Sequence, residues 1–219
     1  MAERIIAIGD VHGCATALES LLNAVGPKDG DLFIPLGDYV DRGPNSKRVI
    51  ELLIDLGKEH RVEPLFGNHE QMMMAVVEGN PPQDWLRYGG VDTLDSYGFS
   101  GNLNVIPEDH LEFFRSCHDF FITDDHFFVH ANYIHNVPLE ELDEATIRWR
   151  SLAESMPGPH KSGKTAVVGH TPDKTGEILD MGYLKCIDTF CYGGQWLTAL
   201  DVLSGSIWQA NEEGEVREK

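Results

Sequence analysis

The feature that most constrains this fold is a pattern that occurs four times: a short apolar stretch, a glycine, and then a side chain with an oxygen or an imidazole. Short apolar runs bounded by turns are typical of buried strands. Parallel strands deliver their carboxyl ends to one edge of a sheet, where α/β proteins bind ligands, so the pattern predicts an α/β fold with a polar site at that edge. The four examples are residues 4–8 before Gly9-Asp10-Val11-His12-Gly13, residues 32–36 before Gly37-Asp38, residues 62–66 before Gly67-Asn68-His69-Glu70, and residues 165–168 before Gly169-His170-Thr171.

Helices are expected between these strands. Leu18, Leu21 and Val25 share one stripe at helical spacing, and Gly26 ends that helix. A second amphipathic helix is expected over residues 46–56. Such strand–helix alternation is the pattern of an α/β sheet covered by helices.

The middle and the end of the chain depart from this alternation. We predict a single domain, residues 1–219, built as two mixed β-sheets flanked by helices. The other expected elements are a helix over residues 85–97 interrupted at Gly89-Gly90, a helix from Pro107 through Phe114, a hairpin of residues 120–123 and 127–130, and a tail from Tyr183 onwards that forms the second sheet, with a turn at Ser204-Gly205.

The charge of the chain excludes some partners. Asp and Glu number 36 against 17 Lys and Arg, giving a formal net charge of −19. Such a surface repels nucleic acid and anionic membranes, so we expect neither as a partner. We also expect a cytoplasmic location, because no signal peptide and no membrane-spanning stretch is recognisable and the four cysteines form no Cys-x-x-Cys pair. Cys14 is expected to be an inert, packed thiol.

The polar residues of the strand ends form a donor set for metals. Oxygen and imidazole donors without thiolates favour divalent ions such as manganese, iron or zinc. Two ions sharing one carboxylate, for which Asp38 is the candidate, can ionise a water and direct it at phosphorus. Arg42 can hold phosphoryl oxygens with its planar fork. His69 can protonate a leaving group, with Asp41 orienting its ring. The candidate ligands are Asp10, His12, Asp38, Asn68, His130 and His170.

Three of these motifs resemble the signature of one enzyme family. GDVHG at 9–13, GDYVDRG at 37–43 and GNHE at 67–70 are similar, in order and spacing, to the phosphoprotein phosphatase family of metallophosphoesterases. The resemblance implies a calcineurin-like metallophosphoesterase fold and two divalent metal ions, with manganese expected first and iron or zinc as alternatives. It implies one metal on Asp10, His12 and Asp38, and the other on Asp38, Asn68, His130 and His170.

The same resemblance assigns the remaining roles. It implies that His69 and Asp41 form the acid dyad and that Arg42 contacts phosphate. A second phosphate-binding arginine follows a tryptophan in the small bacterial and phage members, which Trp149-Arg150 matches here. The chain departs from the eukaryotic members at His130-Ala131-Asn132, where they carry His-Gly-Gly or a close variant. Tyr192, in a glycine-flanked turn, is interpreted as an ordinary turn aromatic rather than a site residue.

One further motif is rejected. Residues 158–165 match the P-loop pattern Gly-x4-Gly-Lys-Thr. A P-loop lies between a strand and a helix whose N–H groups hold the phosphates, whereas the stretch that follows here, residues 165–168, is expected to be a strand. An NTPase is therefore not predicted.

These observations predict a metal-dependent phosphomonoester hydrolase, a serine/threonine or dual-specificity protein phosphatase acting on phosphorylated proteins or peptides through a metal-bridging hydroxide. A symmetrical dinucleoside tetraphosphatase is the alternative, and a non-catalytic metal-binding scaffold is a weaker one. The phosphoprotein is favoured because residues 79–118 carry only Arg87 and Arg115 against six acidic residues. The oligomeric state stays open.

Overall fold

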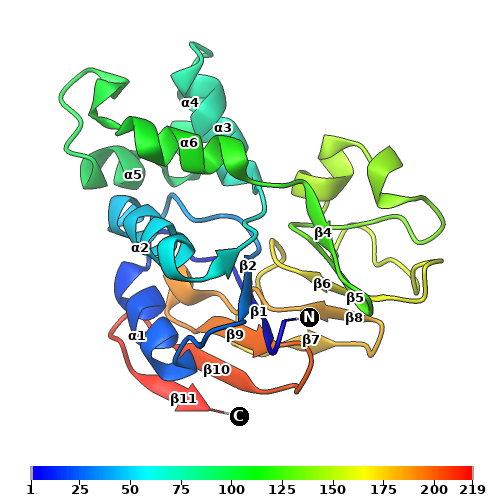
Figure 1. The fold of residues 1–219 in the computed structure, drawn as a ribbon. Coiled ribbons are helices and arrows are strands. Elements are labelled where there is room, and N and C mark those ends of the chain that lie inside the picture. Colours follow the sequence, from blue (N-terminus) through cyan, green and yellow to red (C-terminus); the bar gives the residue numbers. More distant parts are fainter. Residues whose placement is uncertain (1, 219) are drawn as a thin grey trace.

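The computed structural model describes residues 2–218 and shows two mixed β-sheets packed face to face (Figure 1). The first sheet has the order β11-β10-β9-β1-β2-β3, and the second β4-β5-β6-β8-β7. The strands of the first sheet are β1 (Ile5–Ile8), β2 (Leu32–Pro35), β3 (Arg61–Val62), β9 (Leu197–Asp201), β10 (Ile207–Ala210) and β11 (Val216–Glu218). Those of the second are β4 (Phe120–Ile122), β5 (His126–Val129), β6 (Thr165–Val168), β7 (Leu179–Asp180) and β8 (Leu184–Cys186). The predicted α/β sandwich of two mixed sheets is confirmed.

Alternation along the strands builds three apolar layers. In β1, Ile5 and Ala7 join a cluster between the two sheets, whereas Ile6 and Ile8 join a cluster beneath the helices. In β5, Phe128 faces the cluster between the sheets, and its two neighbours face a third cluster on the outer side of the second sheet. Successive side chains of a strand point to opposite faces, so both sheets are buried on both sides.

Helices cover the outer face of the first sheet. In α1, Leu18, Leu21 and Val25 are buried as predicted, and the Gly26 N–H donates to the Leu22 carbonyl at the left-handed cap. Figure 1 shows the middle of the chain as a separate helical group above α2. The helices are α1 (Ala15–Val25), α2 (Ser46–Glu59), α3 (Asn68–Val77), α4 (Gln83–Trp85), η1 (Leu86–Gly90), α5 (Val91–Ser96), η2 (Leu103–Val105), α6 (Glu108–Ser116), η3 (Leu139–Glu141), η4 (Ala145–Trp149) and η5 (Cys191–Gly193).

The helices within residues 79–118, here called the helical insert, and the hairpin were predicted correctly. Gly89, with φ 109°, breaks the run of helix between Trp85 and Ser96, and Pro107 directly precedes α6. β4 and β5 pair antiparallel around Asp124 and Asp125. No helix in the part of the chain that the structure describes is long and apolar enough to cross a membrane.

The prediction for the tail was wrong in part. Of the described strands after Tyr183, β8 alone belongs to the second sheet, whereas β9, β10 and β11 extend the first. β9 pairs antiparallel with β1, with Ala7 opposite Leu200, and the Ser204-Gly205 turn joins β9 to β10 as predicted. The third strand is also shorter than expected, because after Val62 the chain leaves the ladder and Leu65 forms only an isolated bridge to His118.

Candidate metal centre and phosphate site

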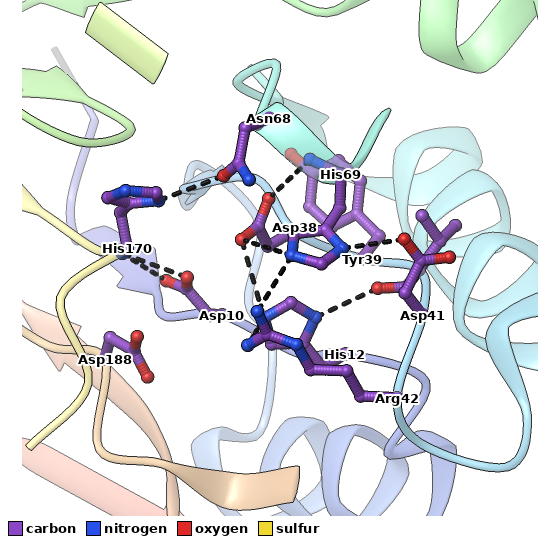
Figure 2. Close-up of polar contacts among 12 residues, drawn as sticks. Asp10, His12, Asp38, Tyr39, Asp41, Arg42, Asn68, His69, His170 and Asp188 are labelled. Atoms are coloured by element: carbon purple, nitrogen blue, oxygen red, sulfur yellow. Dashed lines mark hydrogen bonds and ion pairs between the residues drawn. The ribbon is translucent and has the colours of Figure 1, made fainter. Parts of the chain in front are cut away.

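The strand-end residues meet at one edge of the sandwich (Figure 2). Asp10 follows β1, Asp38 follows β2, and Asn68 opens α3 after β3. His130 and His170 follow the adjacent parallel strands β5 and β6 of the second sheet. The two sheets therefore each deliver ligand candidates to the same place, as the strand–glycine pattern predicted.

The loops that carry these residues are held in a backbone conformation that L-residues rarely adopt. His12, Asp38, Asp41, Arg42 and His170 have φ values of 44°, 52°, 74°, 70° and 63°. Non-glycine residues with such positive φ are uncommon and concentrate at functional sites, where the surrounding structure holds them. The strain therefore marks three of the four loops that the sequence motifs mark, and the loop at Gly67-Asn68 is without it.

Asp38 lies at the centre of the cluster. Its Oδ2 is 3.5 Å from His12 Nε2, and its Oδ1 is 3.4 Å from His130 Nε2. Two groups of potential ligands share it: one consists of His12, Asp38 and His69, and the other of Asp38, His130 and His170, each with its ligand atoms within 4.8 Å of one another. This is the arrangement expected of a carboxylate that serves two metal ions.

Each of the three predicted histidine ligands is anchored through one ring nitrogen. His12 Nδ1 donates to the Val40 carbonyl at 3.0 Å, and His130 Nδ1 donates to the Leu36 carbonyl at 2.7 Å. His170 Nε2 donates to the Trp149 carbonyl at 2.9 Å. The opposite nitrogen of each ring then carries a lone pair directed into the site, the second-shell arrangement found around metal-binding histidines.

The electrostatics of the site also suit metal binding. Burial lowers the pKa of His12 and of His130, and burial together with His130 lowers the pKa of His170 to about 4. These imidazoles are therefore neutral near pH 7, as ligands must be. Burial opposes ionisation of Asp38, but the surrounding imidazoles outweigh it and lower the pKa of its carboxyl group. Neutral imidazoles around an ionised carboxylate fit a divalent ion such as manganese, iron or zinc.

Asp10 lies at the margin of this cluster. Its carboxylate accepts the His170 backbone N–H, at 2.9 Å from Oδ2 and 3.1 Å from Oδ1, and it is absent from both ligand groups among the described residues. Figure 2 shows Asp188 beside it. Burial, Asp188 and Asp38 raise the pKa of Asp10, and burial chiefly raises the pKa of Asp188 to about 7. Sequence reasoning missed Asp188, which follows β8 without an intervening glycine.

His69 and Asp41 form the predicted pair. His69 Nδ1 donates to Asp41 Oδ2 at 2.7 Å, and both side chains are buried. Asp41 also accepts from Trp85 Nε1 at 2.9 Å and from Thr93 Oγ1 at 2.7 Å, so the helical insert fixes the carboxylate. Burial opposes protonation of His69, but Asp38 and Asp41 outweigh it and raise its pKa.

Glu70 holds the loop that presents Asp38. Its Oε2 accepts from the backbone N–H groups of Asp38 at 2.8 Å and Gly67 at 3.0 Å, and its Oε1 accepts from those of Tyr39 at 2.8 Å and Val40 at 3.3 Å. Sequence reasoning left Glu70 without a role. The available signal was its place at the third position of a helix that begins without a side-chain cap.

Arg42 lies over the imidazoles of the site. It donates from Nη1 to His12 Nε2 at 3.1 Å and from Nη2 to His69 Nε2 at 3.0 Å. The ring of Tyr192 stacks on its guanidinium, with Cζ 4.4 Å from the ring centroid. The interpretation of Tyr192 as an ordinary turn aromatic is therefore wrong, because its ring packs into the site.

Arg150 directly follows η4 and stays a prediction as a phosphate ligand. Its neighbour Trp149 is tied to the site through the carbonyl that accepts from His170. Arg148 is bound elsewhere: it forms ion pairs with Asp119 at 2.5 Å and with Glu144 at 3.4 Å. The guanidinium of Arg148, within η4, is therefore already engaged in ion pairs.

The structure also describes three further features that the sequence analysis discussed. The P-loop-like residues 158–165 form an irregular loop that runs directly into β6, with no helix after them. Asn132, where the chain departs from the eukaryotic pattern, is buried and donates to the Ser155 carbonyl at 2.9 Å. Cys14 is buried and packed as expected, and the hydrogen bond with Cys191 and burial raise the pKa of its thiol.

Together, the sandwich and the shared-carboxylate cluster define a metallophosphoesterase. Residues 3–202 match the model of the calcineurin-like phosphoesterase family, and the chain belongs to that family. It is 42% identical over 74 residues, 33% of this chain and 25% of the relative, to a symmetrical bis(5'-nucleosyl)-tetraphosphatase of Acidovorax ebreus. It is 35% identical over 85 residues, 38% of this chain and 37% of the relative, to serine/threonine-protein phosphatase 1 of Salmonella typhimurium. The similarity thus spans only about a quarter to a third of these relatives.

Solved structures share the whole fold. One protein, assigned provisionally as a diadenosine tetraphosphatase, superposes with a TM-score of 0.73 at 21% identity, covering 100% of this chain and 96% of that one. A cold-active protein-tyrosine phosphatase of a Shewanella species superposes with a TM-score of 0.69 at 18% identity, covering 100% of this chain and 80% of that one. At such identities the likeness establishes the fold alone.

Proposed function

We propose that this metallophosphoesterase binds two divalent metal ions on either side of Asp38 and hydrolyses phosphoric esters or anhydrides. The observation that carries the proposal is the position of the Asp38 carboxylate between two groups of imidazoles, in which the rings of His12, His130 and His170 are anchored so that a lone pair of each faces inward. Bound metals would supply an ionised water and neutralise charge on the phosphoryl group. The residues that would hold them are Asp10, His12, Asp38, Asn68, His130 and His170.

The other side chains of the site divide the remaining work. Arg42 binds phosphoryl oxygens with its two terminal nitrogens, which lie beside His12 and His69. His69 gives a proton to the leaving oxygen, and Asp41 holds its ring through the 2.7 Å hydrogen bond. Arg150 is proposed as a second phosphate ligand. A non-catalytic scaffold would have no use for the His69–Asp41 pair, which the insert residues Trp85 and Thr93 hold in place.

For the substrate, we propose first a dinucleoside tetraphosphate cleaved symmetrically. This is the alternative from the sequence, and the comparisons favour it over the phosphoprotein: the Acidovorax relative carries that name, and the protein with the TM-score of 0.73 is assigned to a related activity. The family membership and the site support hydrolysis of a phosphoryl bond whichever of the two substrates is used.

A phosphoprotein is the second candidate, and the charge of the insert favours it. Arg115, one of only two basic residues in the insert, is paired with Glu108 at 2.6 Å. Lys164 donates to the Thr123 carbonyl at 2.7 Å and precedes β6, at the opposite end of that strand from His170. A tetraphosphate chain needs more cationic groups than one phosphoryl group does, so this acidic insert suits a peptide better.

The deciding experiment compares kcat/KM for diadenosine tetraphosphate with that for a phosphothreonine peptide, using one manganese-loaded preparation. We expect the dinucleotide to be preferred by a hundredfold or more, equivalent to about 2.7 kcal/mol in transition-state binding. A preference for the peptide would transfer the assignment to the second candidate. Absence of turnover with both substrates and with p-nitrophenyl phosphate, in protein shown to contain metal, would refute the hydrolase itself.

A further inference from the structure

A further loop, residues 188–194 between β8 and β9, has the same backbone signature as the three loops that carry His12, Asp38 and His170. Among the described residues, six that are not glycine have positive φ, and the sixth is Phe190 at 60°. The other five all belong to the loops that present the proposed ligands and Arg42. Backbone strain that persists in a folded protein is concentrated at functional positions, so this outlier marks the loop for a role in the site.

The loop is built to hold one conformation. The Phe190 N–H donates to Asp188 Oδ1 at 3.2 Å, and the Gln195 N–H returns to the Phe190 carbonyl at 3.1 Å. Gly193 packs so closely on the Phe190 ring that an added Cβ would lie 2.0 Å from its Cε1. Only glycine fits there, and the tight turn fixes the direction of the intervening side chain, Tyr192.

Tyr192 is directed at the phosphate arginine. Its ring centroid lies 4.4 Å from Arg42 Cζ, 4.6 Å from the His12 ring and 4.8 Å from the Phe190 ring. Its phenol stays neutral near pH 7, since burial raises the pKa of Tyr192 to about 12. The ring therefore acts on Arg42 as an aromatic surface rather than as a charge.

We propose that Tyr192 is a positioning residue that holds the Arg42 guanidinium ready for a phosphoryl group. This rests on the phosphate-binding role of Arg42 in the proposed function. An arginine side chain has many rotamers, and a ring packed over its guanidinium restricts them without using any of its N–H donors. With the ring in place, Arg42 does not have to be ordered by the substrate itself.

The test is a double-mutant cycle between Tyr192 and Arg42. In manganese-loaded protein, Tyr192→Leu should weaken the binding of inorganic phosphate, measured by calorimetry, and lower kcat/KM for p-nitrophenyl phosphate, each by about tenfold. Tyr192→Phe, which keeps the ring, should stay within twofold of the wild type. In the Arg42→Ala background, Tyr192→Leu should cost less than a further twofold, because the group that it positions is gone.

A control and a spectroscopic readout keep the proposal independent of turnover. In a similar pair between β3 and β4, the Cζ of Arg61 lies 5.7 Å from the ring centroid of Phe121. Phe121→Leu removes that ring and should leave phosphate binding unchanged. In NMR spectra of metal-free protein, the Arg42 side-chain N–H resonance should carry a ring-current shift that Tyr192→Leu removes and Tyr192→Phe retains.

Two results would overturn the positioning role. The first is a double variant whose loss of phosphate affinity and kcat/KM equals the product of the Arg42→Ala and Tyr192→Leu losses. The second is an Arg42 side-chain N–H resonance that is unchanged in Tyr192→Leu. Failure of the proposed hydrolase would be seen separately, as a wild-type protein that contains metal but turns over none of the phosphate substrates.

Discussion

Replacing Glu70 should reduce the stability of the folded protein by an amount that follows from its hydrogen bonds. In Glu70→Gln, one carboxylate oxygen becomes an NH2 group of nearly the same size. In the wild-type protein, each carboxylate oxygen of Glu70 accepts from two backbone N–H groups: Oε2 from Asp38 and Gly67, and Oε1 from Tyr39 and Val40. Whichever way the amide turns, two buried N–H donors must then face another donor.

The cost follows from those two donors. A buried donor left without an acceptor costs about 1–3 kcal/mol, so the substitution should destabilise the protein by about 4 kcal/mol. That is a large fraction of the roughly 5–15 kcal/mol that holds a domain folded. Urea unfolding measured by circular dichroism should show a midpoint about 1–1.5 M lower, for an m value of about 3 kcal/mol/M.

The loop that Glu70 anchors also carries Asp38, so manganese affinity should fall together with stability. Glu112→Gln is the matched control, because it makes the same chemical change at an exposed position of α6 and should leave both quantities unchanged. If Glu70→Gln unfolded at the same urea concentration as Glu112→Gln, the inferred acceptor role of Glu70 would be refuted.

Three other outcomes are expected. Exhaustive chelation should abolish turnover, and manganese should restore it. Among the carboxylate substitutions, Asp38→Asn should be the most damaging, because Asp38 belongs to both ligand groups. Full turnover by protein shown by elemental analysis to lack metal would contradict the metal requirement. His69→Asn should lower kcat strongly for alkyl phosphates and mildly for p-nitrophenyl phosphate, whose leaving group needs no proton, and equal losses would argue against the acid role. Asp31→Asn should destabilise the fold by about 2 kcal/mol at pH 7, because the buried carboxylate accepts from Arg4 Nε at 2.9 Å. Burial opposes ionisation of Asp31, but Arg4 outweighs it and lowers the pKa of the carboxyl group. The stability that this carboxylate contributes is therefore present above the unfolded pKa of about 4 and is lost as the pH falls below that value. The melting temperatures of the wild type and of Asp31→Asn should become equal over the same pH range.

The sequence predicted the centre of the site because its signals are local. Each of Asp10, Asp38, Asn68 and His170 follows its own apolar stretch and glycine, and parallel strands bring such positions to one edge. His130 ends an expected hairpin strand without an intervening glycine, and in the structure it directly follows β5, the strand next to that of His170. A pattern that depends only on residues close in the sequence can be recognised without knowledge of the tertiary structure.

The contributions that were missed depend on contacts between distant segments. Tyr192 and Arg42 are far apart in the sequence, and nothing local to either residue signals their stacking. The tail strands were assigned to the second sheet because pairing of β9 with β1 leaves no mark in composition or periodicity. Glu70 was overlooked because its four donors come from two loops, and only the folded chain shows that they converge.

The pairing of β1 with β9 has a consequence for how the protein acquires its metals. The Ile5 N–H donates to Asp201 Oδ1 at 3.2 Å across 196 residues, and the Gly9 N–H, just before Asp10, donates to the Thr198 carbonyl at 3.0 Å. On the ribosome, one edge of β1 therefore stays open until residues 197–201 have emerged, and an open strand edge invites wrong pairing. A nascent chain that stops earlier presents the Asp38 loop without the strand that steadies Asp10. We expect metal loading to follow the emergence of residues 197–201 rather than to precede it.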